Sequence, residues 1–119
     1  MKIALTALGT TLDSEIDSRF GRAKNFLLYE TETGSLSVID NSVNLNAAQG
    51  AGIQSAGNIA NSGAKAIITG HCGPKAFRAL KEAGVKVYNA KPGKVIDAIT
   101  FFKSGQLSES SDADVEGHW

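Results

Sequence analysis

The chain has 119 residues, with 12 basic and 12 acidic side chains and a hydrophobic share of 42%. This length allows one domain with a modest core, and this apolar share excludes a wholly disordered chain. No apolar run approaches the roughly 20 residues of a membrane helix, and the first residues lack the pattern of a signal peptide. A single cysteine excludes an internal disulfide and suits the reducing cytoplasm, where we expect the protein to reside.

Short apolar runs between turn residues predict strands, and apolar residues at helical spacing predict helices. We expect strands over residues 2–8, 26–31, 36–40, 64–69 and 85–88. Glycine and proline positions delimit the predicted helices. These cover residues 47–62, 74–83 and about 92–105.

The order of these elements favours a mixed sheet. Residues 32–35 form a hairpin connection, which makes the second and third strands antiparallel. Residues 64–88 form a βαβ unit, which supplies a right-handed parallel pairing. We therefore expect an α/β protein with a ribonuclease-H-like three-layer fold, in which helices cover both faces of a mixed five-stranded sheet. Residues 1–107 are expected to form a single domain and residues 108–119 a flexible acidic tail.

The most informative stretch of the chain is residues 67–77, where a predicted strand is followed by a glycine-containing loop and the start of a predicted helix. Gly70 and Gly73 let the backbone turn and approach a bound group, and Pro74 suits the first helical position. The helix directs unpaired N–H groups and its positive dipole end at this loop. His71 and Cys72 place possible soft-metal ligands there. Cys72 could instead be a small buried filler, although its neighbours favour an exposed loop.

The charge pattern of the middle of the chain agrees with an anionic ligand. Residues 41–81 contain no Asp or Glu, whereas they include four basic side chains: Lys65, Lys75, Arg78 and Lys81. A span without carboxylates around glycine-rich loops suits an anion. The alternative is a basic face exposed to water.

Residues 17–23 form a second candidate segment. Arg19 and Arg22 flank Gly21, so two guanidinium groups could hold an anion while the ring of Phe20 shields one side. The alternative is a core position for Phe20 and ion pairs between the arginines and nearby acids. Those acids are Asp13, Glu15 and Asp17.

A third segment contains Gly50 and Gly52 just ahead of helical residues. Glycines before a helix often serve only to turn the chain, so this motif is weak alone. In the expected sheet, however, its loop could reach the ends of the central strands. Ligands of open α/β sheets usually bind beyond the carboxyl ends of parallel strands.

The segments 17–23, 50–54 and 70–76 resemble successive signatures of the dinitrogenase iron–molybdenum cofactor biosynthesis family. That family includes NifX-type carriers and the C-terminal domain of NifB-type proteins. The resemblance covers residues 2–107, and residues 114–119 are also similar to the ending of small stand-alone members, among them the orange proteins. Many relatives have His at the position of Arg19, which favours an ion-pairing role for that arginine.

The resemblance implies a ribonuclease-H-like fold and non-covalent binding or carriage of an anionic metal–sulfur cluster, for cofactor assembly or metal storage. The cluster would be a molybdenum–copper sulfide, as in the orange-protein branch, or an iron–molybdenum cofactor precursor. The implied partners are cluster donor or acceptor proteins, without nucleic acid or membrane, and the chain would be a monomer or weak oligomer. The candidate cofactor-binding residues are Arg19, Phe20, Gly21, Arg22, Gly50, Gly52, Gly70, His71, Gly73, Pro74 and Lys75. The candidate metal ligands are Cys72, His71 and, in the tail, His118.

Enzymatic functions fit the sequence less well. A nuclease of this fold needs carboxylates that converge on the sheet to hold two cations, yet residues 2–8 and 41–81 carry none. Thiol chemistry at Cys72 would lack a second cysteine to resolve a disulfide. One thiolate also cannot hold a ferredoxin-type cluster, which needs about four, so the site is expected to be electrostatic. A regulatory module that binds a small anion or nucleotide through the same loops is the alternative to the non-enzymatic cluster carrier.

Overall fold

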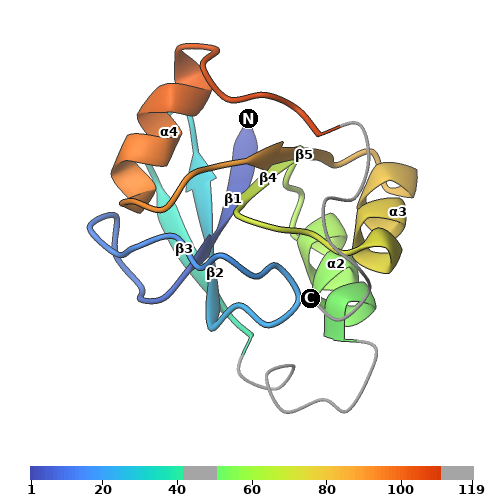
Figure 1. Cartoon of the computed structure of the whole chain (residues 1–119). Coiled ribbons are helices and arrows are strands. Elements are labelled where there is room, and N and C mark those ends of the chain that lie inside the picture. Colours follow the sequence, from blue (N-terminus) through green and yellow to red (C-terminus); the bar gives the residue numbers. More distant parts are fainter. Residues whose placement is uncertain (42–50, 111–119) are drawn as a thin grey trace.

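A computed structural model describes residues 1–41 and 51–110 of the chain. Its sheet has the strand order β3-β2-β1-β4-β5. The strands are β1 (Lys2–Ala7), β2 (Asn25–Glu30), β3 (Leu36–Asp40), β4 (Ala66–Thr69) and β5 (Lys86–Asn89). The helices are α2 (Ala51–Asn61), α3 (Pro74–Glu82) and α4 (Val95–Lys103) (Figure 1).

The sheet is mixed, as the sequence predicts. β2 is antiparallel to both β1 and β3, whereas β4 is parallel to β1 and to β5. β1, β4 and β5 therefore end at the same edge of the sheet. The central strands β1 and β4 are buried on both faces, which explains their continuous apolar runs. The edge strand β3 is half exposed.

Side chains that alternate along the strands divide the core in two. Ile67 points into a cluster with residues of α2 and α3, and its neighbour Ile68 points into a cluster with residues of α4. The first cluster includes Ile59 and Leu80, and the second includes Ile99. Figure 1 shows α4 on one side of the sheet and α2 and α3 on the other. The prediction of helices on both faces is confirmed.

The element boundaries differ from the predicted ones at a few places. β1 ends at Ala7, and Leu8 beyond it is half exposed. The last helix begins at Val95 and not near residue 92, because the backbone of Gly93 and Lys94 pairs with residues 15–16. The first N–H groups of α4 donate to carbonyl oxygens of residues 12 and 14, which satisfies that helix end. Part of the helix predicted over residues 47–62 lies outside the described residues.

Residues 109 and 110, which belong to the segment 108–119 expected to form the tail, pair with the edge strand β5. Tyr88 of β5 forms an antiparallel bridge with Glu109, and the Ser110 N–H donates to the Val87 carbonyl over 2.7 Å. Residues 109–110 thus extend the sheet beyond β5. The rest of the predicted tail lies outside the described residues.

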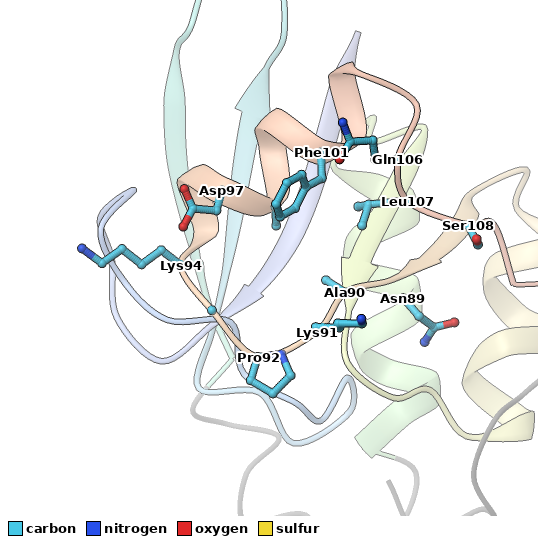
Figure 2. A pocket seen from close by; sticks show the side chains of 12 residues that line it. Asn89, Ala90, Lys91, Pro92, Lys94, Asp97, Phe101, Gln106, Leu107 and Ser108 are labelled. Atoms are coloured by element: carbon cyan, nitrogen blue, oxygen red, sulfur yellow. The ribbon is translucent and has the colours of Figure 1, made fainter.

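A cavity of about 440 Å³ opens between the β5–α4 connection, α4 and residues 106–108. Phe101 and Leu107 line it from two sides, whereas Lys94 extends away from Phe101 (Figure 2). The described residues around this cavity all lie outside the segments 17–23, 50–54 and 70–76. No helix in the described parts of the chain has both the length and the apolar character needed to cross a membrane.

Candidate functional site

Two of the three sequence segments are joined directly by their backbones. The Phe20 N–H donates to the His71 carbonyl over 3.0 Å, and Arg19 and His71 form a parallel bridge. Residues 17–23 follow β1 after an intervening loop, and residues 70–73 follow β4. The joined segments therefore lie beyond the carboxyl ends of adjacent parallel strands, the usual ligand site of an open α/β sheet.

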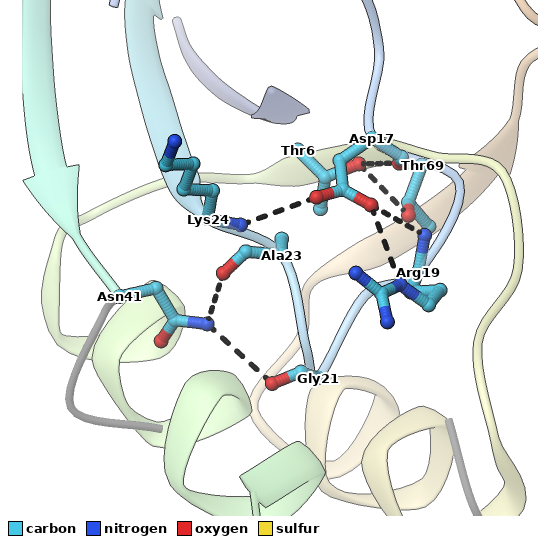
Figure 3. A network of polar contacts seen from close by, with 8 residues as sticks. All are labelled: Thr6, Asp17, Arg19, Gly21, Ala23, Lys24, Asn41 and Thr69. Atoms are coloured by element: carbon cyan, nitrogen blue, oxygen red, sulfur yellow. Dashed lines mark hydrogen bonds and ion pairs between the residues drawn. The ribbon is translucent and has the colours of Figure 1, made fainter. Parts of the chain in front are cut away.

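Asp17 holds the first segment in its turn. Its side chain is 3% exposed and accepts hydrogen bonds from the backbone N–H groups of Arg19 (3.1 Å) and Lys24 (3.2 Å) (Figure 3). The Thr6 hydroxyl donates to the Asp17 carbonyl oxygen over 2.6 Å and lies 3.0 Å from the Thr69 hydroxyl. The segment is thus tied to the ends of both β1 and β4. The sequence signal for this turn was an Asp two residues before Arg19, the spacing of an Asx turn.

Buried polar side chains connect the first segment to the start of α2. The Asn41 amide donates to the carbonyl oxygens of Ala23 (2.8 Å) and Gly21 (3.4 Å). The Ser55 hydroxyl lies 3.2 Å from the Asn41 amide oxygen and 3.4 Å from the Gly21 carbonyl oxygen. Sequence reasoning missed Asn41 and Ser55, because no local pattern indicates that residues so far apart meet. Gly52 lies in the first turn of α2, and Gly50 is outside the described residues.

The exposed charged side chains within the described part of these segments are basic. The Arg19 side chain is 44% exposed, Arg22 is half-buried, and Lys75 and His71 are exposed. Pro74 is also exposed, at the first position of α3. The N-cap residue of that helix, Gly73, has no side chain to accept the first N–H groups, and the first turn contains no acidic residue. This helix end favours negative charge.

A carboxylate with a perturbed pKa lies away from these segments. The pKa of Glu30 is lowered, mainly by its hydrogen bond with the N-terminal ammonium group and then by the Glu32 N–H. Glu30 pairs with Lys2 at the amino end of β1, the opposite edge of the sheet from the candidate site. It therefore does not offset the positive charge of the candidate site.

Phe20 is a core residue, which was the alternative to the expected role of shielding a bound anion. Its side chain is fully buried, and its ring packs against Phe26 with centroids 5.3 Å apart. The ring therefore does not shield a surface-bound anion. The Arg19 Nε atom lies 3.8 Å from an Asp17 carboxylate oxygen, so the ion pair named in the same alternative is also present.

Cys72 is likewise buried, contrary to the expected exposed loop. Its residue surface is 1% exposed, it belongs to the core cluster beneath α2 and α3, and its thiol points to the Gly73 carbonyl oxygen at 3.7 Å. A surface-bound metal ion cannot reach this sulfur without rearrangement. Among the described residues, no group of three or more His, Cys, Asp or Glu side chains could hold a metal ion. His118 lies beyond the described residues.

The family assignment follows from comparison with known proteins. Residues 1–105 match the family described as "Dinitrogenase iron-molybdenum cofactor". The chain belongs to this family. The resemblance of the three sequence segments is thereby confirmed.

Several relatives match this family member over nearly the whole chain. The apo form of the orange protein from Desulfovibrio gigas is 38% identical, with a TM-score of 0.93 and 96% coverage of both chains. The Thermotoga protein TM1290 is 35% identical, with a TM-score of 0.84 and 98% coverage of both chains. Protein MJ0580 of Methanocaldococcus jannaschii is 33% identical over 113 residues, covering 92% of this chain and 95% of its own.

Proposed function

We propose that this protein binds and carries an anionic metal–sulfur cluster, of the molybdenum–copper or iron–molybdenum type, without catalysing a reaction. Membership of a cofactor family and the similarity to the orange protein support this function. The observation that carries it is the contact between residues 17–23 and residues 70–76 at one edge of the sheet. Within residues 17–23, 51–54 and 70–76 the only carboxylate is Asp17, which is buried and already hydrogen-bonded.

The proposed cargo brings its own sulfide ligands, so the protein needs few of its own. The basic side chains of Arg19, Arg22 and Lys75 would bind the negatively charged sulfide surface. The first N–H groups of α3, at the positive end of the helix dipole, would donate further hydrogen bonds to it. His71 is exposed and is the described imidazole that could contribute a ligand. A carrier must also release its cargo, and a site held by charge and hydrogen bonds suits release better than a cage of thiolates.

We also propose that the fold is ribonuclease-H-like. The strand order β3-β2-β1-β4-β5, with β2 antiparallel to its neighbours, supports that assignment. Residues 1–110 would then act as one cluster-binding domain, which exchanges its cargo with donor or acceptor proteins in the cytoplasm as a monomer or weak oligomer.

Reconstitution with a defined cluster source tests the proposal. Protein purified without oxygen is mixed with tetrathiomolybdate and Cu(I), and bound metal is measured by absorption and by elemental analysis after gel filtration. Arg22→Glu is expected to abolish uptake, since each charge-assisted contact is worth about 1.5–3 kcal/mol before the added repulsion. The control is Lys65→Glu, the same charge change on an exposed side chain before β4, at the opposite edge.

Two outcomes would contradict the proposal. One is full uptake by a folded Arg22→Glu protein, which would mean that the basic surface does not hold the cluster. The other is an absence of uptake by the unmodified protein together with saturable binding of phosphate or a nucleotide that Arg22→Glu removes. That second result would support the regulatory anion-binding module instead.

A further inference from the structure

The side chain of Asn89 joins the candidate site to the segment after α4. Asn89 is the last residue of β5, and its amide nitrogen donates to the Gly70 carbonyl oxygen over 2.9 Å. Its amide oxygen accepts a hydrogen bond from the Ser110 hydroxyl. One amide group therefore links the first residue of the β4–α3 loop with a residue 40 positions further along the chain.

The bond to Gly70 fixes the direction of a peptide plane within the site. Because a trans peptide is planar, anchoring the Gly70 carbonyl also sets the orientation of the following His71 N–H. His71 is the residue that pairs with Arg19 and accepts the hydrogen bond from Phe20. Asn89 therefore orients the peptide that directly precedes the His71 carbonyl, the acceptor of the Phe20 N–H.

The other end of this link is held by strand pairing. Besides the Ser110 bond to Val87, Glu109 bridges Tyr88 and its carboxylate lies 4.0 Å from the Lys86 ammonium group. A cavity of about 260 Å³ lined by Phe77 and Val85 lies against residues 109–110. Release of these residues from β5 would remove the hydroxyl that orients the Asn89 amide.

We propose that Asn89 is a positioning residue of the cluster-binding surface, and that residues 109–110 hold Asn89 in its working orientation. This inference rests on the proposed cluster binding. The C-terminal segment then influences cargo affinity without touching the cargo, since it acts through Ser110, Asn89 and the Gly70 carbonyl. An Asn suits this position because its amide offers a donor to Gly70 and an acceptor to Ser110 at the same time.

The test measures two quantities: amide hydrogen exchange at the contact between residues 17–23 and the β4–α3 loop in the protein without cargo, and the affinity of the protein for its cargo. Asn89→Ala removes both links, Ser110→Ala removes only the outer one, and Ser108→Ala changes an exposed serine as a control. Amide hydrogen exchange is followed at Phe20, whose N–H reports the pairing with His71, and at Glu30, whose N–H bonds to Ser35 elsewhere. Binding of tetrathiomolybdate with Cu(I) is titrated for each protein.

We expect Phe20 to exchange about three- to tenfold faster in Asn89→Ala, the factor that one hydrogen bond corresponds to, with Glu30 unchanged. Ser110→Ala should shift the same amide less, and the double variant should equal Asn89→Ala, since both changes act through one link. Cargo affinity should fall in the same order. Ser108→Ala should match the unmodified protein.

Unchanged hydrogen exchange at Phe20 in both Asn89→Ala and Ser110→Ala would overturn the inference. It would also be overturned if Ser108→Ala changed this exchange as much as those two variants do. If Asn89→Ala does not fold, Ser110→Ala alone decides the result. The unmodified protein could take up no thiometallate while the Phe20 amide still exchanges faster in the variants. The proposed function would then fail, and the link from Ser110 to the loop would stand. If the unmodified protein takes up the cargo and the Phe20 amide exchanges faster in the variants, but the variants bind the cargo with unaltered affinity, only the positioning role would be overturned.

Discussion

The backbone of Ser18 crosses Gly70 so closely that a Cβ atom at position 70 would lie 2.8 Å from both the Cα and the carbonyl oxygen of Ser18. Real Cβ atoms do not approach backbone that closely, so only glycine fits without displacing the neighbouring segment. The glycine is therefore needed for contact between two family segments and not for an unusual φ angle, since Gly70 is not among the glycines with positive φ.

Gly70→Ala should consequently separate residues 17–20 from the β4–α3 loop. We expect a loss of about 1–3 kcal/mol in the free energy of unfolding, the usual cost of overpacking, together with weaker thiometallate binding. Urea denaturation and metal titration measure the two effects. Gly57→Ala is the matched control, because a Cβ there meets nothing within 4 Å and the helix should gain about 0.5–1 kcal/mol. A Gly70→Ala protein as stable as the unmodified one would contradict the close contact.

The sequence predicted the strands and helices well but not the direction of individual loop side chains. Hydrophobic spacing identifies a strand such as β4, because each of its residues is buried by a neighbouring layer. In the loop after β4, His71 is exposed and the adjacent Cys72 is buried, and nothing in their local sequence distinguishes the two. The difference arises from the packing of α3 and residues 17–20 over the loop.

Lys75 offers a way to separate folding from cargo binding. It lies exposed in the first turn of α3, where the helix dipole disfavours positive charge. Lys75→Glu should therefore raise the free energy of unfolding by up to about 1 kcal/mol while it weakens thiometallate binding. Thermal unfolding at low ionic strength and metal titration measure the two effects. Parallel changes in stability and binding would show that Lys75 affects the cargo only through the fold.

The burial of Cys72 predicts slow thiol chemistry. A thiol that is 1% exposed should react with an aromatic disulfide reagent far more slowly in the native protein than in denaturant. Cys72→Ser should lose about 1–3 kcal/mol of stability, because a hydroxyl replaces the thiol in an apolar cluster, and should still take up thiometallate when folded. Cys72→Ala serves as the control for lost packing. Failure of the folded serine variant to bind cargo would instead identify the thiolate as an essential ligand.

Two truncations distinguish the described end of the domain from the residues that follow it. Ending the chain after Ser110 keeps the pairing with β5, so the free energy of unfolding should not change. Ending it after Leu107 removes the Ser110 bonds to Val87 and Asn89, which should cost about 1–3 kcal/mol at roughly 1 kcal/mol for each hydrogen bond.

The truncation after Ser110 also tests the effect of the acidic ending on the rate of cargo binding. Residues 111–119 contain Asp112, Asp114 and Glu116 but no Lys or Arg. Because these carboxylates repel an anionic cargo, removal of residues 111–119 should speed the association of tetrathiomolybdate with the protein, and added salt should reduce the difference. Stopped-flow absorption at two ionic strengths measures both effects. Identical rates with and without residues 111–119 would leave this segment no part in loading, and any influence of the C-terminal region would then depend on residues 109–110.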